Sequence, residues 1–487
     1  MVIPQGDHVL TDRAEASEMA SAKDVLHNIP AVDQLLGDLE AEEAAAPRRV
    51  VVDAVRAAVE RARTGLLADP EEDIAEAALR EAILADARTR IRAWVQPHYR
   101  KVINATGIIL HTALGRAVLP EKAQRQLAEE LSGYSLLQAD PETGKRSRRD
   151  ARIEALLVKL TGAEAATVVN NNAAATMIVL NTVACGKEVI VSRGQLVEIG
   201  GSFRLPEVMA ASGARMVEVG TTNKTHPRDY ENAVTENTAA ILRVHPSNYK
   251  IYGFSSEVPL ADLERIAHAR GLVLIDDLGA GPLIDLSAYG LPKEPTLQES
   301  VQAGADLITS SADKLIGASQ GGIILGKKQW IDVIRTSPLA RIVRVGKLTL
   351  AVLEATLTLF LDEETAIREM PTMRMLLRRT DDIAEQAQRI AQALGKRTQA
   401  AAFTAVEGFS QLGSGSLPTH DVPTRLVAVA PKTISPDDLA RRLRLGTPGV
   451  FTRIHEDRVL IDPRTLQGGE EPLLVEAVAG ALGAAQD

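Results

Sequence analysis

The sequence contains very little cysteine: Cys185 is the only one in 487 residues. One thiol cannot form an internal disulfide or a cysteine-rich metal site, so packing of apolar side chains must hold the fold together, and no metal site is predicted. Cys185 ends the apolar helical pattern of NTVACGKE. We therefore expect it to pack in the core as a small apolar side chain rather than to act as a reactive thiol.

Long apolar runs are also missing. No stretch approaches the roughly 20 apolar residues that a membrane-spanning helix needs. The N-terminus, MVIPQGDHVLTDRAEASEM, lacks the basic-then-apolar pattern of a secretion signal. We therefore expect a cytoplasmic protein that does not enter a membrane.

Positive charge is not in excess either. The formal net charge is −9 and the isoelectric point is near 5.6, whereas nucleic-acid binders are usually basic. A local basic patch can nevertheless bind RNA. Lys145-Arg146-Ser147-Arg148-Arg149 is such a patch, although a solvated loop would have the same composition.

The length of the chain exceeds what one hydrophobic core supports, so several domains are expected. Residues 1–90 show apolar residues at helical spacing, as in VVVDAVRAAVERARTGLL, and predict a module of short helices interrupted by Pro30 and Pro47. Residues 91–344 predict a large α/β domain. Residues 345–487, helix-rich and then mixed, predict a small C-terminal α/β domain.

Short β-branched runs alternate with helical patterns in the large domain. This alternation predicts a mainly parallel sheet covered by helices on both faces, with ligands bound at the carboxyl ends of the strands. The predicted strands are 165–169, 188–192, 214–219, 239–244, 272–276, 306–310 and 322–326.

Three features follow predicted strands in an informative order. Asn170-Asn171-Asn172-Ala173-Ala174 precedes a helix, whose free N–H groups could bind a phosphate, although such residues are often only caps. Asp276-Asp277 ends the 272–276 strand and suggests a carboxylate for a pyridinium nitrogen, a metal ligand or a cap. Two adjacent carboxylates also require a cationic partner nearby.

Lys314, 37 residues after Asp277, is the third feature. A lysine in an otherwise apolar region is costly unless it has a use, and burial makes its amine nucleophilic, as Schiff-base formation requires. An isolated surface lysine is the usual alternative. The order of phosphate turn, aspartate and lysine resembles the aspartate-aminotransferase-like, fold-type-I enzymes that use pyridoxal 5'-phosphate.

Longer stretches of the chain resemble bacterial selenocysteine synthase, the L-seryl-tRNA(Sec) selenium transferase family. The resemblance extends from IPAVDQLL near the N-terminus to QLGSGSLP in the C-terminal part. Between them it is carried by INATGIILHTALGRA, VVNNNAAATMIVL, GKEVIVSRGQLVEIGGSFRLPEVM, VGTTNKTH, VHPSNYKIYGF, DLGAGPLIDLSAYGLPKEPT and KLTLAVLEATL.

The resemblance implies conversion of seryl-tRNA(Sec) to selenocysteinyl-tRNA(Sec). In the family, the seryl amine binds the cofactor as an aldimine, the hydroxyl is eliminated, and selenium from selenophosphate adds to an aminoacrylyl group. Lys314 matches the family's Schiff-base lysine, Asp277 the carboxylate at the ring nitrogen, and Asn171, Asn172 and Ala173 the phosphate-side turn.

The resemblance also assigns arginines to the anionic selenium donor, because they stay charged and present several donors. These are Arg116, Arg341 and Arg344; the last two would share a face if they lie on one helix, although such a face could also be merely ion-paired. Weaker candidates for the pocket are Thr221, Thr222, Asn248 and Tyr249. The chain departs from the family around Lys314, with Ala312 in place of glycine and Ala318-Ser319 in place of Gly-Pro.

By the same resemblance, the N-terminal module would grip the tRNA and the subunits would form a homodecamer with shared sites; no DNA partner is expected. Arg48, Arg49, Arg56, Arg61 and Arg63 would supply the positive face, despite the acidic Asp38, Glu40, Glu42 and Glu43. The module could instead be an oligomerisation arm. Alternatives for the whole chain are a pyridoxal lyase without tRNA or a non-catalytic RNA-binding relative. A nicotinamide enzyme is disfavoured because no G-x-G-x-x-G follows the first strand.

Overall fold

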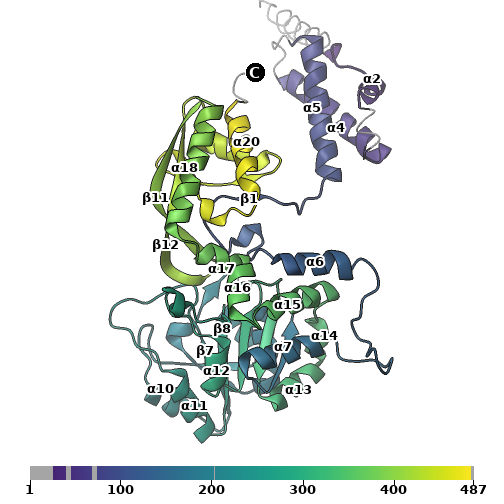
Figure 1. The fold of residues 1–487 in the computed structure, drawn as a ribbon. Coiled ribbons are helices and arrows are strands. Elements are labelled where there is room, and N and C mark those ends of the chain that lie inside the picture. The colour runs from purple at the N-terminus through teal and green to yellow at the C-terminus, as the bar shows by residue number, and fades with distance from the viewer. Residues whose placement is uncertain (1–25, 40–44, 69–73, 202, 484–487) are drawn as a thin grey trace, which may run out of the picture. The chain divides into compact units, whose positions relative to one another are not determined.

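The computed structural model describes residues 26–39, 45–68, 74–201 and 203–483. The chain divides into two compact units, Met1–Lys101 and Val102–Asp487. Each unit has its own apolar core. Figure 1 shows the helices of the first unit in purple tones.

The first unit is helical in its described parts, with α2 (Val32–Gly37), α4 (Arg48–Ala68) and α5 (Glu76–Val95). Apolar residues at helical spacing, such as Val51, Val55 and Ala58, are buried between α4 and α5. The opposite side of α4 is polar and carries its arginines. The predicted acidic residues Glu40, Glu42 and Glu43 lie outside the described residues.

The second unit is built on a seven-stranded sheet with the order β2-β10-β9-β8-β7-β3-β6. All pairings are parallel except the two that β10 makes. The seven predicted strands are the seven strands of this sheet, with ends that agree to within three residues. They are β2 (Ala165–Val169), β3 (Glu188–Ser192), β6 (Arg215–Val219), β7 (Thr238–Val244), β8 (Val273–Gly279), β9 (Leu307–Ser311) and β10 (Gly322–Gly326).

Helices cover both faces of this sheet, because alternate residues of each strand point to opposite sides. Ile190 joins the core cluster that contains α7 and α11, whereas Val189 and Val191 join the cluster that contains α8, α9 and α13. The helices are α6 (Glu121–Glu130), α7 (Ala151–Thr161), α8 (Asn172–Ala184), α9 (Leu205–Ala211), α10 (Pro227–Ala233), α11 (Leu260–Ala269), α12 (Leu297–Gln302), α13 (Lys328–Thr336) and α14 (Pro338–Ile342). A short ribbon, β4 (Glu198–Ile199) with β5 (Phe203–Arg204), lies outside the sheet.

Cys185 corrects one expectation. It follows α8 directly and is exposed, so its predicted place in the core is wrong. The apolar pattern ends with the buried Ala184, one residue earlier.

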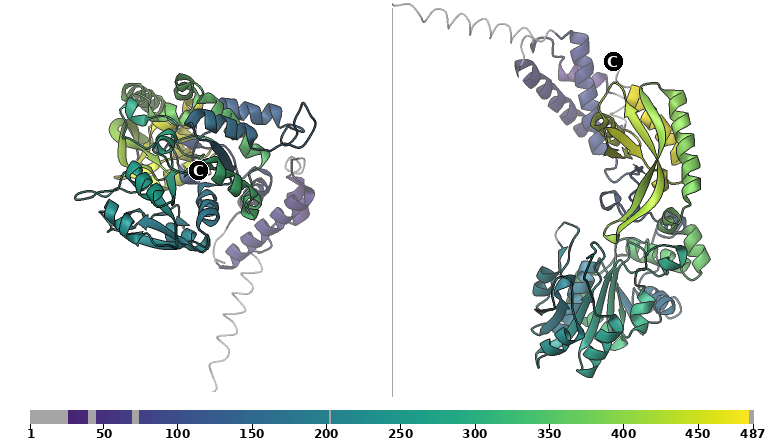
Figure 2. Two further views of the ribbon diagram at one scale, coloured as in Figure 1. Left: turned by 90° about the horizontal axis from the view of Figure 1, so that it is seen from below. Right: turned by 90° about the vertical axis from the view of Figure 1, so that its left-hand side faces the viewer.

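The C-terminal part begins with α15 (Lys347–Leu359), α16 (Glu363–Glu369) and α17 (Pro371–Leu376), which pack with the large domain. A four-stranded antiparallel sheet follows, with the order β11-β12-β15-β14. Its long hairpin of β11 and β12 runs from this sheet toward the large domain (Figure 2, right). The elements are α18 (Thr380–Arg397), β11 (Ala401–Gly413), β12 (Ser416–Pro431), α19 (Pro436–Leu445), β13 (Val450–Phe451), β14 (Arg453–His455), β15 (Arg458–Ile461) and α20 (Glu470–Gly483).

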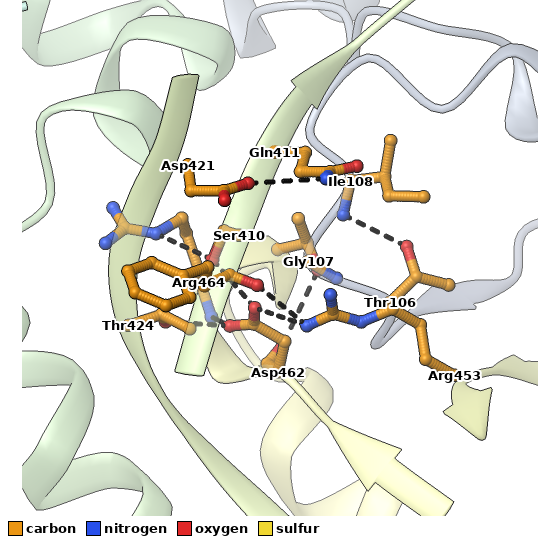
Figure 3. Close-up of polar contacts among 12 residues, drawn as sticks. Thr106, Gly107, Ile108, Ser410, Gln411, Asp421, Thr424, Arg453, Asp462 and Arg464 are labelled. Carbon is orange, nitrogen blue, oxygen red and sulfur yellow. Dashed lines mark hydrogen bonds and ion pairs between the residues drawn. The ribbon is translucent and has the colours of Figure 1, made fainter. Parts of the chain in front are cut away.

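The start of the second unit is bound to its end. Strand β1 (Ile103–Asn104) pairs with β13, and the next residues pack against a buried polar cluster around Asp462 (Figure 3). The fully buried Asp462 carboxylate accepts hydrogen bonds from Ser410 Oγ at 2.7 Å, Thr424 Oγ1 at 3.0 Å and the Arg464 amide at 3.0 Å. Gly107 lies so close that a Cβ there would be 2.0 Å from Asp462 Oδ2.

Within the described parts of the chain, no helix is long and apolar enough to cross a membrane. The same residues include no group of three or more histidine, cysteine, aspartate or glutamate side chains placed to hold a metal ion.

Candidate active site

A cavity of about 600 Å³ lies at the carboxyl ends of the central strands. Since β7, β8 and β9 are neighbours in the sheet, the residues at their ends meet there: His245 after β7, Asp277 within β8 and Lys314 after β9. We call it the Lys314 cavity. Six of the predicted site residues line it: Lys314, Asp277, Arg116, Asn171, Asn172 and Ala173.

Lys314 is buried, with 7% of its surface exposed. Burial lowers the pKa of its amine, and the positive charge of Arg116 lowers it further, against the opposing effect of Asp313 and Asp277. A lysine with a lowered pKa is neutral, and therefore nucleophilic, in a larger fraction of molecules at neutral pH. The backbone turns directly after it, where the Gly317 amide donates to the Lys314 carbonyl at 3.0 Å.

Asp277 is held as a hydrogen-bond acceptor. Its carboxylate receives Asn172 Nδ2 at 2.9 Å, Thr176 Oγ1 at 2.8 Å and the Gly279 amide at 3.1 Å. Three donors fix the orientation of this carboxylate. The preceding Asp276 is fully buried and points elsewhere, since its carboxylate pairs with Arg243 at 2.8 Å. The cationic partner that two adjacent carboxylates require is therefore present.

The Asn171 turn combines capping with exposure to the cavity. Asn171 Oδ1 accepts the Ala174 amide at 2.9 Å and so caps α8. The amides of Asn172 and Ala173 belong to the first turn of α8, which has no intrahelical acceptors, so they remain available to an anion. The side chain of Asn172 faces Asp277 and thereby orients the carboxylate.

Arg116 adopts a left-handed backbone, with φ of 61°. Its guanidinium donates to Asp313 Oδ2 at 2.6 Å, and its Nε is buried without a partner among the described residues. The pair fixes a positive charge beside Lys314, because Asp313 is the residue that precedes it.

Arg341 and Arg344 lie away from this site in the structure. Both are exposed, and neither lines the Lys314 cavity. They do not share a helix face, because α14 ends at Ile342 and Arg344 forms a backbone bridge with Val169. With Arg146 they lower the pKa of Arg149, after the larger effect of burial. Arg146, Arg149, Arg341 and Arg344 thus form a cationic cluster.

Two arginines of the basic patch at 145–149 have partners within the chain. Arg148 pairs with Glu154, and Arg149 donates to Gln138 Oε1 at 2.6 Å and to the Val345 carbonyl at 3.0 Å. These two arginines are therefore not those of a purely solvated loop.

The β11–β12 hairpin completes the cavity with residues that the sequence did not indicate. Ser414 and Gly415, at the tip of the β11–β12 hairpin, line it. The hairpin tip is held in place by the Ile109 and Leu110 amides, which donate to the Gln411 and Leu412 carbonyls at 2.9 and 2.7 Å. In the sequence, these residues belong to the stretch QLGSGSLP. That stretch resembles the family, but the resemblance assigns no role to its individual residues.

The weaker candidates divide between two cavities. Asn248 lines the Lys314 cavity, as does the unpredicted Ser247. Thr221, Thr222 and Tyr249 line a second cavity of about 450 Å³. His245 lies in the wall of both, and sequence reasoning missed it because it appears only as one residue of VHPSNYKIYGF.

The two alanines near Lys314 that depart from the family pattern, Ala312 and Ala318, fit without backbone strain. Ala312 and Ala318 are buried, and the amide of Ala318 donates to the Ala312 carbonyl at 2.9 Å. Neither alanine has a positive φ, so neither position requires glycine.

Comparisons with known proteins identify the family of the chain. The family model described as L-seryl-tRNA selenium transferase matches residues 102–467. The chain belongs to the L-seryl-tRNA selenium transferase family. A second model, described as selenocysteine synthase N terminal, matches residues 26–63.

Curated relatives in this selenium transferase family match almost end to end. The protein named L-seryl-tRNA(Sec) selenium transferase from Alkaliphilus metalliredigens is 45% identical over 93% of this chain and 98% of that relative. Its namesake from Nitratidesulfovibrio vulgaris is 48% identical over 90% of this chain and 92% of that relative. The predicted family resemblance is confirmed.

Solved structures show the same fold. D-glucosaminate-6-phosphate ammonia-lyase aligns with a TM-score of 0.54 at 23% identity, covering 80% of this chain and 97% of that one. At this identity the likeness concerns the fold alone. Together with the strand order, it confirms the predicted α/β fold class.

The cavity suits the predicted cofactor, pyridoxal phosphate. A buried amine, a carboxylate and a helix N-terminus line one cavity, and they match an aldehyde, a pyridinium N–H and a phosphate. Asp277 Oδ2 accepts only Thr176 among the described residues and so has capacity for one more donor.

Proposed function

We propose that this protein converts L-seryl-tRNA(Sec) to L-selenocysteinyl-tRNA(Sec), with selenophosphate as selenium donor and pyridoxal phosphate as cofactor. The observation that carries the proposal is the family match over residues 102–467, a range that contains all the residues of the Lys314 cavity. The relatives named above carry the name of this reaction.

Each residue of the cavity has a role in this proposal. When bound, pyridoxal phosphate draws electrons away from the α-carbon of an attached amino acid. Lys314 would hold the cofactor through its Nζ and, once released, take the α-proton. Asp277 would hold the ring N–H, oriented by Asn172 and Thr176. The Asn172 and Ala173 amides would face the phosphate, while Asn171 keeps their helix capped.

Selenophosphate requires fixed positive charge. Arg116 supplies one such charge within the Lys314 cavity, held by Asp313. We assign Arg341 and Arg344 to the same donor, and since they lie outside that cavity in one chain, this assignment requires a site completed by a neighbouring subunit. The homodecamer implied by the family resemblance would provide that neighbour.

Residues 1–90 form the proposed tRNA-binding module, with 91–344 as the cofactor domain and 345–487 as the small domain. Arg49, Arg56, Arg61 and Arg63 are exposed on α4, which supports a phosphate-binding surface. The match of residues 26–63 to the selenocysteine synthase N-terminal model disfavours a lyase without tRNA. We place the reaction in the cytoplasm, where aminoacylated tRNA is available.

The test is incubation of the cofactor-loaded protein with seryl-tRNA(Sec) and selenophosphate, followed by analysis of the aminoacyl group. Selenocysteinyl-tRNA(Sec) is the expected product, and omission of selenophosphate or the substitution Lys314→Ala should abolish it. A protein that carries the cofactor on Lys314 but leaves the seryl group unchanged would refute the proposed substrate.

A further inference from the structure

His245 stands between the two cavities of the large domain. It directly follows β7 and lies in the wall of both the Lys314 cavity and the second cavity. Its ring Nε2 lies 3.0 Å from Glu294 Oε2. The two side chains are 19% and 7% exposed.

Glu294 has no other hydrogen-bond partner among the described residues. A buried carboxylate is costly unless a donor satisfies it, and an ionised carboxylate only accepts. The histidine Nε2 must therefore carry the proton of this contact. Nδ1 is then the ring nitrogen left for other groups, so Glu294 determines both the orientation and the tautomer of His245.

The other titratable groups of the Lys314 cavity are committed. Asp277 accepts three hydrogen bonds, and Arg116 is paired with Asp313 and does not release its proton. Glu198 is 63% exposed and pairs with Arg204 at 3.3 Å. Lys314 is the expected holder of the α-proton. His245 is the remaining side chain in the wall of this cavity that can both donate and accept a proton through its ring nitrogens.

We propose that His245 is the general acid that protonates the departing seryl hydroxyl, and that Glu294 is its positioning residue. The inference rests on the proposed function. The Cα–H proton goes to Lys314, the Cβ–O bond breaks with its electron pair on oxygen, and the proton of the His245 imidazolium converts that oxygen to water. His245 then takes a proton from solvent.

Charged side chains line the second cavity, whose wall also includes His245. Lys224, Lys250, Lys293, Glu257 and His420 line it, and Lys293 is itself paired with Asp285 and Glu299. Glu294 is the acidic group in direct contact with His245. Its carboxylate therefore places a negative charge beside the ring, opposite to the charge of the lysines in the same cavity wall.

The experiment compares two substrates in single-turnover reactions of the cofactor-loaded enzyme. Seryl-tRNA(Sec) needs a proton on its leaving group, whereas β-chloroalanyl-tRNA(Sec) releases chloride without one. His245→Gln keeps an amide donor for Glu294 and removes the acid. It should slow the seryl substrate about 10²- to 10⁴-fold, the usual contribution of a general acid, and the chloro substrate less than about tenfold.

Glu294→Gln tests the positioning role independently of any folding defect in His245→Gln. Loss of the negative partner should move the pH limb of the seryl reaction to lower pH and leave the chloro reaction's profile unchanged. His268→Gln is the matched control, because this histidine also contacts carboxylates, Glu264 at 2.8 Å and Asp306 at 2.9 Å, but lines neither cavity.

Equal losses on both substrates in His245→Gln, or an unmoved pH limb in Glu294→Gln, would overturn the inference. If the wild-type enzyme still converts seryl-tRNA(Sec), the proposed function is unaffected by that result. A wild-type enzyme that is inactive on seryl-tRNA(Sec) but active on other amines would overturn the proposed function, and the inference with it.

Discussion

The reactivity of Lys314 depends on charges that a few neighbouring side chains place around it. Burial and Arg116 lower the pKa of its amine, whereas Asp313 and Asp277 raise it. Arg116 has a double effect, because it also neutralises Asp313 through a 2.6 Å contact. Removal of Arg116 would therefore raise the pKa of Lys314 in two ways: it removes a nearby positive charge and leaves the negative charge of Asp313 unpaired.

We predict that Arg116→Gln moves cofactor capture to higher pH. The amine is nucleophilic only when neutral, and the substitution raises its pKa by removing a positive charge and freeing a negative one. The measurement is the fraction of pyridoxal phosphate that borohydride fixes to Lys314 as a function of pH. Arg125→Gln, at an exposed arginine near Glu121, is the control. An unchanged midpoint in Arg116→Gln would contradict the electrostatic account.

Sequence reasoning located Lys314, Asp277 and the Asn171 turn because each follows a strand whose apolar pattern is plain. It could not show that the Asn172 side chain would orient Asp277, 105 residues away. Nor could it pair His245 with Glu294, 49 residues apart. Such contacts depend on how loops fold back over the strand ends, which periodicity does not encode.

At the scale of single elements, the segment after β1 packs against the end of β15, where Gly107 faces Asp462. Gly107 has φ of 75°, and any side chain there would collide with the Asp462 carboxylate. Gly144 has a similar φ of 67°, but a Cβ added there would have no atom within 4 Å among the described residues. The two glycines therefore separate backbone strain from steric collision.

We predict that Gly107→Ala destabilises the protein by more than about 3 kcal/mol, since it adds a core collision to left-handed strain. Gly144→Ala should cost only the strain, roughly 1–2 kcal/mol. Urea unfolding at one fixed protein concentration measures both. Similar losses for the two variants would show that Asp462 moves aside freely.

At the scale of the whole molecule, the seven strands of the main sheet were predicted from their apolar runs, and the structure confirms them. The position of Arg341 and Arg344 was not predictable in the same way. Their spacing suggested one helix face, but α14 ends at Ile342 and Arg344 joins Val169 instead. Where a helix ends because its next residues pair with a distant strand, the local sequence does not predict that end.

We predict that removal of residues 1–101, the whole first unit, abolishes binding of seryl-tRNA(Sec) and leaves cofactor capture by Lys314 unchanged. The exposed arginines of α4 would be lost, while the residues that line the Lys314 cavity all remain. Filter binding of labelled seryl-tRNA(Sec) and borohydride fixation measure the two properties. Undiminished tRNA affinity would assign this unit to oligomerisation instead.

The hairpin tip at Ser414 and Gly415 has a consequence for biosynthesis. The residues that line the Lys314 cavity extend from Thr112 to Gly415, and Thr112 hydrogen-bonds with Ser414, 302 positions later. The segment before Thr112 also depends on β13 and Asp462 for its partners. A ribosome therefore synthesises Lys314 long before the residues that complete its pocket. The nascent chain can form the finished cavity only after the hairpin tip, β13 and Asp462 have also been synthesised.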